Sequence, residues 1–446
     1  PKLQITTGSN GDREKFTFSC WFKVCQDKGA NQTLISWNDG THKPKIFIDN
    51  TSEQLEFITS TNTTDNIKTT RSFRDYSAWY HLVVAMDTTQ STDTNRMKIY
   101  VNGEQQTSLA TANYMTQDLT TTVMSNTEIC IGRDITDDDE PFDGYMAEIF
   151  VVDGTAYAAS DFGKTNNNGV WVPIDAKDDI TFGTHGFYME FKQTGTSQNS
   201  SGIGADTSGN DNHYAVTNLA AIDVTTDTPT NNFCTWNPLY KNSGNVAYTP
   251  SSISEGNLKL TLQNDSAMLG TMGVSKGKWY WEYKLAENTS DNQDYPIIGF
   301  ANNSHTASAS NLVGRGTPDG DTSRGNVGSG RVSNAFDDAD LSANDIIGFY
   351  LDMDNETLIL HKNGSDWMGS GATSGLDFSS ASYANTSDGF FYPFTQNNGL
   401  SITGDQANFG NPSFSISSSN ADANGYGSFE YNPTLSSTNY YALCSK

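Results

Sequence analysis

Apolar and polar residues alternate with a period of two through most of this sequence. From Phe16 to Val24 every second side chain is apolar, as expected of a strand with one buried face. No window of twelve or more residues combines helical periodicity with caps at both ends. The pattern therefore predicts an all-β protein, with further strands at 80–86, 97–101, 145–151, 186–191, 258–262, 278–285, 346–353 and 357–362.

Two of these strands allow a prediction about which side chains face the core. In the predicted strand 145–151, strict alternation places four residues on one face: Tyr145, Ala147, Ile149 and Val151. In the strand 278–285 the aromatic core face alternates with a polar face that carries Glu282. We therefore predict that Glu282 on this polar face is a cross-strand partner and not a catalytic acid.

Turn signals and length together predict the domain organisation. Asn102-Gly103 and Asp153-Gly154 each follow a predicted strand, and many short strands separated by such turns are typical of β-sandwiches. A chain of 446 residues is too long for one ordinary core. A Thr/Asp/Pro-rich stretch predicts an irregular linker. We predict two consecutive antiparallel β-sandwiches, at 1–218 and 251–446 with a C-terminal tail, joined by a linker at 219–250.

Composition and charge exclude several classes of protein. Only 35% of the residues are hydrophobic, but 11% are aromatic, which argues against a disordered chain. The formal net charge is −26, from 26 basic and 52 acidic residues. Such a chain repels phosphate backbones and anionic lipid, so we expect neither nucleic-acid binding nor membrane insertion. Five cysteines without a C-x-x-C spacing favour small core residues over a zinc or redox motif.

Five segments of the first half, taken in order, resemble one family. They are 18–22, 77–89, 96–105, 142–154 and 206–214, and they include SAWYHLVV, YVNG, FDGYMAE and DTSGNDN. Their order is similar to that of laminin-G-like, concanavalin A-like jelly rolls. The resemblance implies such a jelly roll for the first module.

Five segments of the second half resemble a different sandwich. KGKWYWEYKL at 276–285 is followed by matching segments at 297–302, 344–364, 391–394 and 407–410. This order of landmarks is similar to that of SPRY domains. The resemblance implies a SPRY-like sandwich for the second module.

The order of the parts resembles structural proteins of marine tailed phages, of the kind found in cyanophages. It runs from the jelly roll through GVWVP at 169–173 and CTWNP at 234–238 to the SPRY-like module. The resemblance implies a non-catalytic virion surface protein, a tail fibre or head decoration, that binds host surface glycans or neighbouring virion subunits. It also leads us to expect a homo-oligomer. A polysaccharide-degrading virion enzyme and a purely architectural subunit are the alternatives. Relatives usually carry a strand before the position of Pro1, which suggests a trimmed or incompletely read N-terminus.

Motifs for catalysis fail when their context is considered. Glycan hydrolases of this fold need paired carboxylates on one strand face, as in E-x-D-x-E, and the sequence has none. The G-x-S-x-G string at 273–277 is followed by a predicted strand instead of a helix. His81 alternates with core residues, which predicts a structural, hydrogen-bonded histidine. We therefore expect no catalytic residues.

Calcium is the one cofactor that the sequence suggests. Asp137, Asp138, Asp139, Glu140 and Asp143 place five carboxylates within seven positions just before a strand, and calcium prefers clustered oxygen ligands. A solvated acidic turn is the alternative. A second candidate pair, in a Gly/Asn-rich turn, is Asp206 and Asp211.

Ligand-binding side chains are expected on loops at the sandwich ends or on a concave sheet face. Sugars need aromatic rings with amide and carboxylate partners nearby. The candidates in the first module are Trp37, Asn38, Asp39 and His42, and those in the second are Tyr295, Arg315, Arg324 and Trp367. Packing within the loops or contact between subunits is the alternative for each.

Overall fold

The computed structural model describes most of the chain and divides it into two units. The described residues are 1–59, 65–240, 252–262, 266–287, 296–302, 312–315, 342–367, 375–378, 389–397 and 402–446. The first unit comprises 1–224 and 228–230, and the second comprises 225–227 and 231–446. Within these ranges the only helical elements are short 3-10 turns, η1 (Asp93–Asn95), η2 (Ala159–Asp161), η3 (Lys177–Asp179) and η4 (Ala221–Asp223). The all-β prediction is confirmed.

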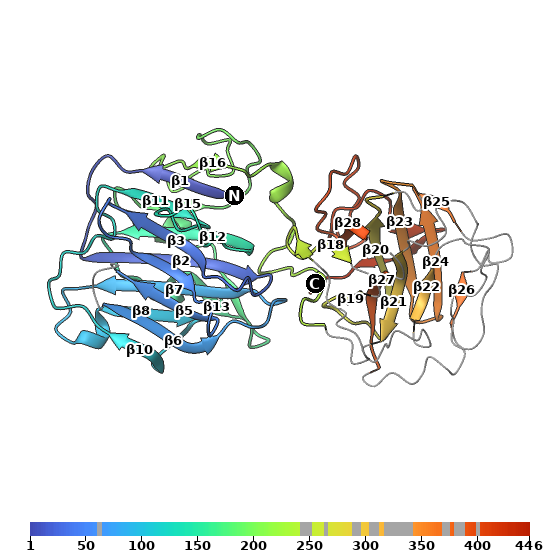
Figure 1. Ribbon diagram of the computed structural model, residues 1–446, viewed down its shortest axis with the longest axis horizontal. Coiled ribbons are helices and arrows are strands. Elements are labelled where there is room, and N and C mark those ends of the chain that lie inside the picture. Colours follow the sequence, from blue (N-terminus) through green and yellow to red (C-terminus); the bar gives the residue numbers. More distant parts are fainter. Residues whose placement is uncertain are drawn as a thin grey trace. The chain divides into compact units, whose positions relative to one another are not determined.

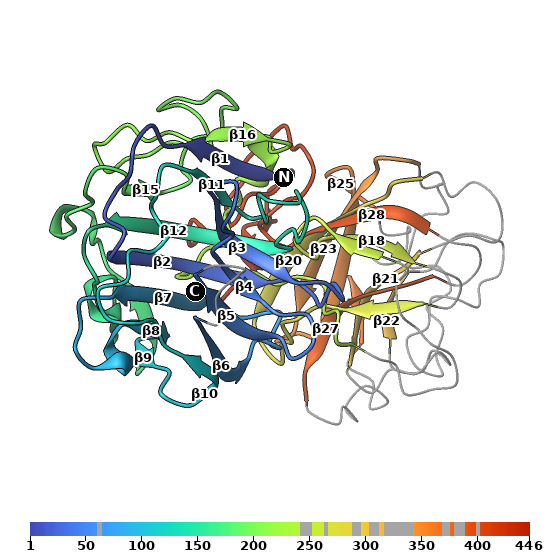
Figure 2. The same cartoon turned by 60° about the vertical axis from the view of Figure 1, so that its left-hand side comes forward.

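The first unit is a sandwich of two antiparallel sheets (Figure 1). The eight-stranded sheet has the order β10 (Leu109–Asn113), β6 (Asn66–Ser72), β5 (Gln54–Ile58), β4 (Lys45–Ile48), β3 (Gln32–Asn38), β11 (Glu128–Ile131), β1 (Lys2–Thr6) and β16 (Ala215–Thr217). The six-stranded sheet has the order β15 (Phe187–Met189), β12 (Gly144–Asp153), β2 (Lys15–Val24), β7 (Tyr80–Asp87), β8 (Met97–Val101) and β9 (Glu104–Gln105). Figure 2 shows β12, β2, β7 and β8 side by side in this order.

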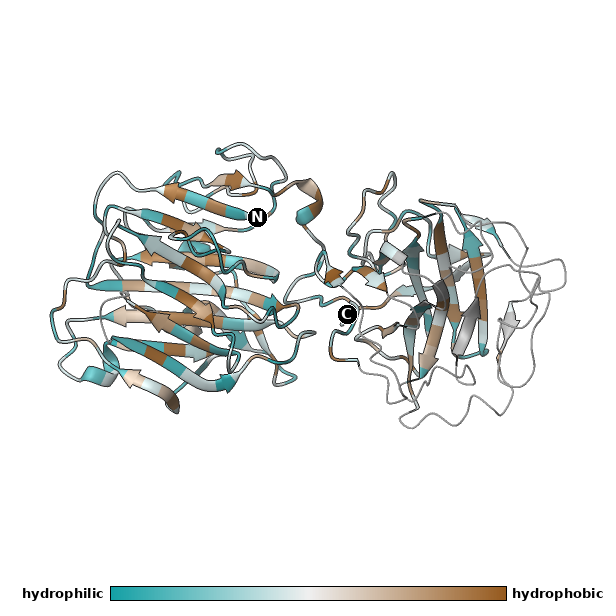
Figure 3. Cartoon of the chain, viewed as in Figure 1, coloured by the Kyte–Doolittle hydropathy of each residue, from teal (hydrophilic) through white to brown (hydrophobic). Residues whose placement is uncertain are grey.

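The core of the first unit lies between these two sheets. Phe16 of β2 packs edge-on against Trp37 of β3, with ring centroids 5.3 Å apart. The side chains that alternate in the sequence point into this core, and Figure 3 shows the resulting alternation of brown and teal along the strands. Asn102 and Gly103 form the tight turn between β8 and β9 with positive φ angles of 49° and 85°, as expected of an Asn-Gly hairpin.

Strand β12 corrects the predicted alternation of 145–151. Its register against β2 shifts between Ala147 and Phe150, and Glu148 has a φ of 50°. This β-bulge reverses the pattern, because an extra residue moves later side chains to the other face. Ile149 and Val151 point into the core as expected, whereas Tyr145 and Ala147 lie on the outer face beside β2.

The outer face of the six-stranded sheet is covered by the chain between β12 and β15. A second apolar cluster forms there around Phe150, Phe162 and Phe182. The short hairpin of β13 (Gly163–Thr165) and β14 (Trp171–Pro173) belongs to this cover. Part of the outer face of the six-stranded sheet is therefore buried beneath this cover.

The second unit is also a sandwich of two sheets. The nine-stranded sheet has the path β17 (Ser252–Ser254), β18 (Lys259–Leu262), β28 (Ile402–Asn408), β20 (Lys278–Lys284), β23 (Ile346–Asp352), β24 (Thr357–Lys362) and β25 (Ser365–Asp366), with β26 (Leu376–Asp377) on β24 and β31 (Tyr441–Ala442) on β20. The four-stranded sheet has the order β19 (Ala267–Leu269), β27 (Phe391–Asn397), β21 (Pro296–Asn302) and β22 (Leu312–Arg315). A small hairpin is formed by β29 (Thr434–Leu435) and β30 (Thr438–Asn439). A single apolar cluster fills the space between the two main sheets.

Part of the predicted linker belongs to this second unit. Cys234 and Trp236 are fully buried in its core. The backbone N–H of Trp236 donates to the carbonyl of Asn257, and that of Cys234 donates to the carbonyl of Leu443. Residues 231–240 therefore belong to the second unit. The sequence analysis assigned them to the linker because a Thr/Asn/Pro-rich composition does not reveal how deeply the single Trp is buried.

The predicted polar face of β20 is covered by the C-terminal segment. Glu282 is completely buried and accepts hydrogen bonds from the backbone N–H groups of Glu430 and Tyr431 at 3.1 and 2.8 Å. Tyr280 packs edge-on against Phe429 on the same face. Asn408 of the neighbouring β28 lies opposite Glu282 and donates to its carboxylate at 2.8 Å, so the predicted cross-strand partnership is confirmed. Alternation identifies the two faces of a strand but did not reveal the segment that covers this one.

The sequence analysis expected the five cysteines in the core, and four of them are buried there. Cys20, Cys25, Cys130 and Cys234 are buried, and Cys444 is half-buried. No helix in the described part of the chain has the length and apolar character needed to span a membrane.

Candidate functional site

Polar side chains cross the outer face of the eight-stranded sheet in register. Phe47 of β4 lies opposite Glu56 of β5, and Glu56 lies opposite Lys68 of β6. Asp49 follows β4 directly, and Asn66 begins β6. We call this surface the polar face and define it by Lys45, Phe47, Asp49, Glu56, Asn66 and Lys68.

Hydrogen bonds and ion pairs fix the side chains of the polar face. The Lys68 ammonium lies 3.0 Å from a carboxylate oxygen of Asp49 and 3.9 Å from one of Glu56. The Asn66 amide donates to Glu56 at 2.6 Å, and the Asn113 amide donates to Asn66 at 2.8 Å. Donors and acceptors therefore alternate across three strands in fixed positions.

Hydrogen bonds and an ion pair favour the ionised form of Asp49 on this face. Burial alone would raise the pKa of Asp49, but hydrogen bonds from Ser52 and Lys68 outweigh burial and hold this pKa well below its usual value. The side chains of Glu56 and Lys68 keep 15% and 20% of their surface exposed. The face can therefore offer carboxylate, amide and ammonium groups to a ligand rich in hydroxyl groups.

Phe47 is the aromatic residue of this face, and its ring contacts the ammonium group of Lys45. Its ring lies 4.7 Å from the Lys45 ammonium and is only 7% exposed. A cation over an aromatic ring is stabilised by the ring quadrupole. Phe47 therefore orients Lys45 toward the loop that follows β11.

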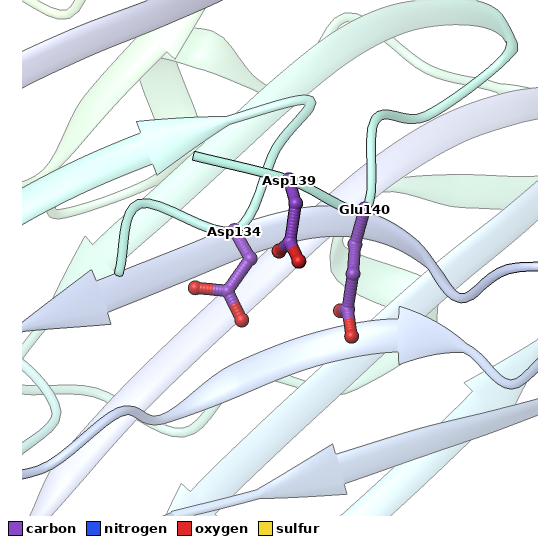
Figure 4. A group of neighbouring side chains, drawn as sticks. All are labelled: Asp134, Asp139 and Glu140. Atoms are coloured by element: carbon purple, nitrogen blue, oxygen red, sulfur yellow. The ribbon is translucent and has the colours of Figure 1, made fainter. Parts of the chain in front are cut away.

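Three carboxylates of that loop converge on Lys45. Asp134, Asp139 and Glu140 each bring one oxygen within 4.8 Å of the others, and Figure 4 shows the three side chains pointing to the same side. The Lys45 ammonium lies 3.0 Å from Asp134 and 2.6 Å from Glu140. The cluster therefore contains a cation of its own.

The electrostatics agree with a charge-compensated cluster. Burial would lower the pKa of Lys45, but its hydrogen bonds to Glu140 and Asp134 outweigh burial and raise it. Burial and the neighbouring Glu140 and Asp134 carboxylates raise the pKa of Asp139. Asp139 is thus the member whose charge the lysine compensates least.

The structure does not bring the five predicted calcium ligands together. Asp139 and Glu140 join the cluster, whereas the other three pair with separate bases: Asp137 with Lys43, Asp138 with Lys2 and Arg133, and Asp143 with Lys28. Asp134 and Lys45 were missed. Asp134 stands three residues before the acidic run, in the same loop, and a wider window of the sequence would have included it. Lys45 is distant in the sequence, and the pairing of β3 with both β4 and β11 brings it to the loop.

The second calcium candidate is a loop-forming aspartate. Asp206 is buried, and its carboxylate accepts the backbone N–H groups of Tyr188, Ser208 and Asn212. Asp211 is exposed and lies 3.6 Å from His213. The two carboxylates therefore have different partners, and Asp206 shapes the loop by accepting backbone donors.

The first group of predicted ligand residues is divided between core and turn. Trp37 is fully buried in the core, so its ring is not available to stack on a sugar. Asn38 and Asp39 accept the backbone N–H groups of Gly40 and Thr41, and Asp39 also contacts His42 Nδ1 at 2.9 Å. These polar residues build the turn between β3 and β4.

In the second unit only one of the four predicted ligand residues has a described side chain. Trp367 is 2% exposed and lies in the core, so the expectation of a surface aromatic is wrong. Arg315 ends β22, and its side chain is outside the described part of the structure. Tyr295 and Arg324 lie outside the described residues. The predictions that Trp37 and Trp367 are exposed were both wrong, because a tryptophan close to a turn in the sequence can still point into the core.

One serine and histidine pair of the first unit invites a test for hydrolytic chemistry. Ser19 Oγ lies 2.9 Å from His81 Nε2, and the Trp171 indole N–H donates to His81 Nδ1 at 3.0 Å. A histidine that accepts at Nδ1 carries its proton on Nε2 when neutral, so it donates to Ser19. This pair is therefore not arranged for general-base activation of the serine, and the prediction of a structural His81 is confirmed.

The comparison with family models agrees with the sandwich architecture of the first unit. Residues 2–161 match the family model of the concanavalin A-like lectin/glucanases superfamily, and the first unit is a concanavalin A-like domain. A comparison with curated proteins by sequence gave no match.

Three solved structures illustrate the structural similarity. A heptameric SAP-like pentraxin from Limulus polyphemus is 14% identical, with 35% of this chain and 71% of that chain covered and a TM-score of 0.27. A carbohydrate binding protein, described as putative, from Bacteroides ovatus is 17% identical, with coverages of 44% and 54% and a TM-score of 0.29. The SPRY domain of human HERC1 is 14% identical, with coverages of 35% and 90% and a TM-score of 0.23.

Proposed function

We propose that this chain is a binding protein without catalytic activity, and that the polar face of its first unit binds glycans. The observation that carries the proposal is the row of fixed donors and acceptors formed by Glu56, Asn66 and Lys68. This row lies within the residues that match the lectin and glucanase superfamily. A surface with both kinds of hydrogen-bonding group suits ligands whose hydroxyls both donate and accept.

The order of sequence landmarks supports a place for the chain on a phage virion. We propose a tail fibre or head decoration displayed outside the host cell, where its partners are host surface glycans and neighbouring virion subunits. Polar contacts of one copy are weak, and several copies on one particle would raise the overall affinity through multivalency. The net charge of −26 favours a soluble surface that repels other anionic surfaces.

Glycan-array binding on host envelope polysaccharides tests this proposal. Glu56→Gln and Lys68→Met should each weaken binding at least tenfold, because each removes a charged hydrogen-bonding group. Glu104→Gln, which changes an exposed residue of β9 in the other sheet, is the matched control and should bind normally. Equal binding by all four proteins would refute the polar face as the site, and release of sugar fragments would refute binding without turnover.

A further inference from the structure

The polar face contains two ammonium groups, and each of them is already paired with carboxylates of the chain. Lys68 lies 3.0 Å from Asp49 and 3.9 Å from Glu56. Lys45 lies 2.6 Å from Glu140. A ligand carboxylate that approached either ammonium group would therefore meet a carboxylate of the chain beside it, and like charges repel each other.

The bases around the acidic loop beside this face are paired in the same way. Lys43 lies 3.6 Å from Asp137. Asp138 lies 2.7 Å from Lys2 and 3.2 Å from Arg133. Each of these bases thus has a carboxylate of the chain as its partner, so the border of the polar face does not provide them as free cations for an acidic ligand.

Negative charge predominates on the polar face and the neighbouring cluster. Together they carry two ammonium groups and five carboxylates, a formal net charge of −3; the carboxylates are those of Asp49, Glu56, Asp134, Asp139 and Glu140. They are most crowded around Asp139, whose pKa is raised by burial and by the Glu140 and Asp134 carboxylates. The whole chain carries −26. An anionic ligand is therefore repelled both at a distance and at contact.

An uncharged sugar hydroxyl can bind this face without meeting such repulsion. Each hydroxyl donates one hydrogen bond and can accept others. An ammonium group has three N–H donors and a carboxylate has about four acceptor sites, so Lys68 and Glu56 both keep capacity beyond their contacts within the chain. Neighbouring hydroxyls of one sugar can therefore accept from Lys68 and donate to Glu56 while the ion pairs of the face remain in place.

We propose that the polar face selects uncharged glycans and rejects acidic ones, whose sugars carry carboxylate or sulfate groups. The inference rests on the proposed glycan binding by this face and adds the class of sugar that the face accepts. The selection arises from charge, because hydroxyl groups match Glu56 and Lys68, whereas anionic groups meet a surface that is negative overall. Specificity of this kind depends on repulsion of the wrong ligand as much as on attraction of the right one.

Matched polysaccharides test the selection with the full chain. The panel contains soluble glucans, galactans and mannans with free C6 alcohols, and the same polymers after oxidation of these alcohols to carboxylates. In about 0.15 M salt the wild type should bind neutral polymers at least about tenfold more tightly than their oxidised forms, because opposed like charges weaken binding. Salt of about 1 M, which shortens the screening length to about 3 Å, should reduce this ratio.

Asp139→Asn tests whether the charge beside the polar face causes the selection. Asp139 is exposed and is not one of the residues that define the face. The variant should lower the ratio of neutral to oxidised binding at least about twofold, because one repelling charge is removed. Glu104→Gln removes the same charge from β9 in the other sheet and should keep the wild-type ratio. Thermal unfolding verifies that both variants are folded.

The outcomes separate this inference from the proposal on which it rests. Suppose that Glu56→Gln weakens binding and that the wild type binds an oxidised polymer as tightly as its neutral form. The selection would then be overturned, and glycan binding by the polar face would stand. Equal changes of the ratio in Asp139→Asn and Glu104→Gln would also overturn the selection. If Glu56→Gln weakens the binding of no polymer, the polar face is not the glycan site, and both proposals fail.

Discussion

The Trp171 indole donates its N–H to Nδ1 of His81, 3.0 Å away beneath the covered face of the six-stranded sheet. Nδ1 can accept this hydrogen bond only while it carries no proton, so protonation of the ring would break the bond. His81 is 1% exposed and also contacts Ser19. Burial lowers the pKa of His81 to about 3, so the folded first unit keeps this histidine uncharged.

The first unit should therefore lose stability in acid. Below the unfolded-state pKa of 6.5, the unfolded chain binds a proton that folded His81 does not bind until the pH approaches 3. This difference lowers the free energy of unfolding by roughly 1.4 kcal/mol per pH unit within that window. Urea unfolding of the first unit between pH 7 and pH 4 measures the slope. His81→Gln should remove this contribution, whereas the control His361→Gln should leave the slope of the first unit unchanged.

Asp405 of the second unit should have the opposite effect, because it should make the free energy of unfolding fall as the pH rises. Burial raises the pKa of Asp405 to about 6, although hydrogen bonds from the Ala286 N–H and the Tyr283 hydroxyl oppose the rise. Its contribution to stability is complete below the unfolded-state pKa of 3.8 and is lost as the pH rises through 6. The loss is about 3 kcal/mol.

Asp405→Asn isolates this effect. The amide can accept from Ala286 and donate to Tyr283, so the hydrogen bonds are largely kept. Urea unfolding of the second unit should then show a stability that falls less steeply between pH 4 and pH 6 than that of the wild type. A slope equal to that of the wild type would show that Asp405 does not titrate as described.

Glu282 should attach the C-terminal segment to the central strand of the second unit. Its two oxygens accept four hydrogen bonds, from the side chains of Tyr280 and Asn408 and the backbone of Glu430 and Tyr431. In Glu282→Gln the amide group faces at least one of these donors, and an unsatisfied buried donor costs about 1–3 kcal/mol. Hydrogen exchange of 429–446 should increase in this variant and remain unchanged in the exposed control Glu255→Gln. Unchanged exchange in both variants would contradict the attachment.

Lys45 should determine how the acidic cluster responds to calcium. Lys45→Met removes the cation that lies between Asp134 and Glu140, and the loss of one partner from a half-buried ion pair should cost about 3 kcal/mol. Calcium ions can then take the place of the ammonium, because three carboxylate oxygens remain close together.

Thermal unfolding with and without 1 mM calcium, roughly the affinity range of extracellular calcium modules, measures this response. The variant should recover at least half of its lost stability, whereas the wild type and the control Lys98→Met should not respond. A wild type that calcium stabilises as strongly as the variant would show that Lys45 does not replace the ion.

The sequence predicted most of the strands because burial on one face imposes alternation on each strand separately. It did not predict what covers a face. The polar face that carries Glu282 is buried by a distant segment, and Trp367, which was expected at the surface, is enclosed by the core. The bulge at Glu148 was also missed. It places Tyr145 on the opposite face of the strand from Ile149 and Val151, although the apolar residues continue to alternate in the sequence.

The polar face depends on pairings that no local motif contains. Glu56 and Lys68 are opposite each other only because β5 and β6 pair in this register. Lys45 meets Asp134 and Glu140 because β3 pairs with β4 on one side and β11 on the other. The run of carboxylates in the sequence therefore identified the acidic loop after β11, but it did not identify Lys45, whose ammonium group balances the negative charge of that loop.

Lysine acetylation followed by mass spectrometry tests the central claim, glycan binding at the polar face, most directly. The protein is labelled with and without the polysaccharide that it binds best on the array. The account predicts that the ligand protects Lys45 and Lys68 from acetylation and leaves Lys98 and Lys276, which lie on other surfaces, as reactive as before. Protection of Lys276 without protection of Lys68, or unchanged reactivity of all four at saturating ligand, would contradict it.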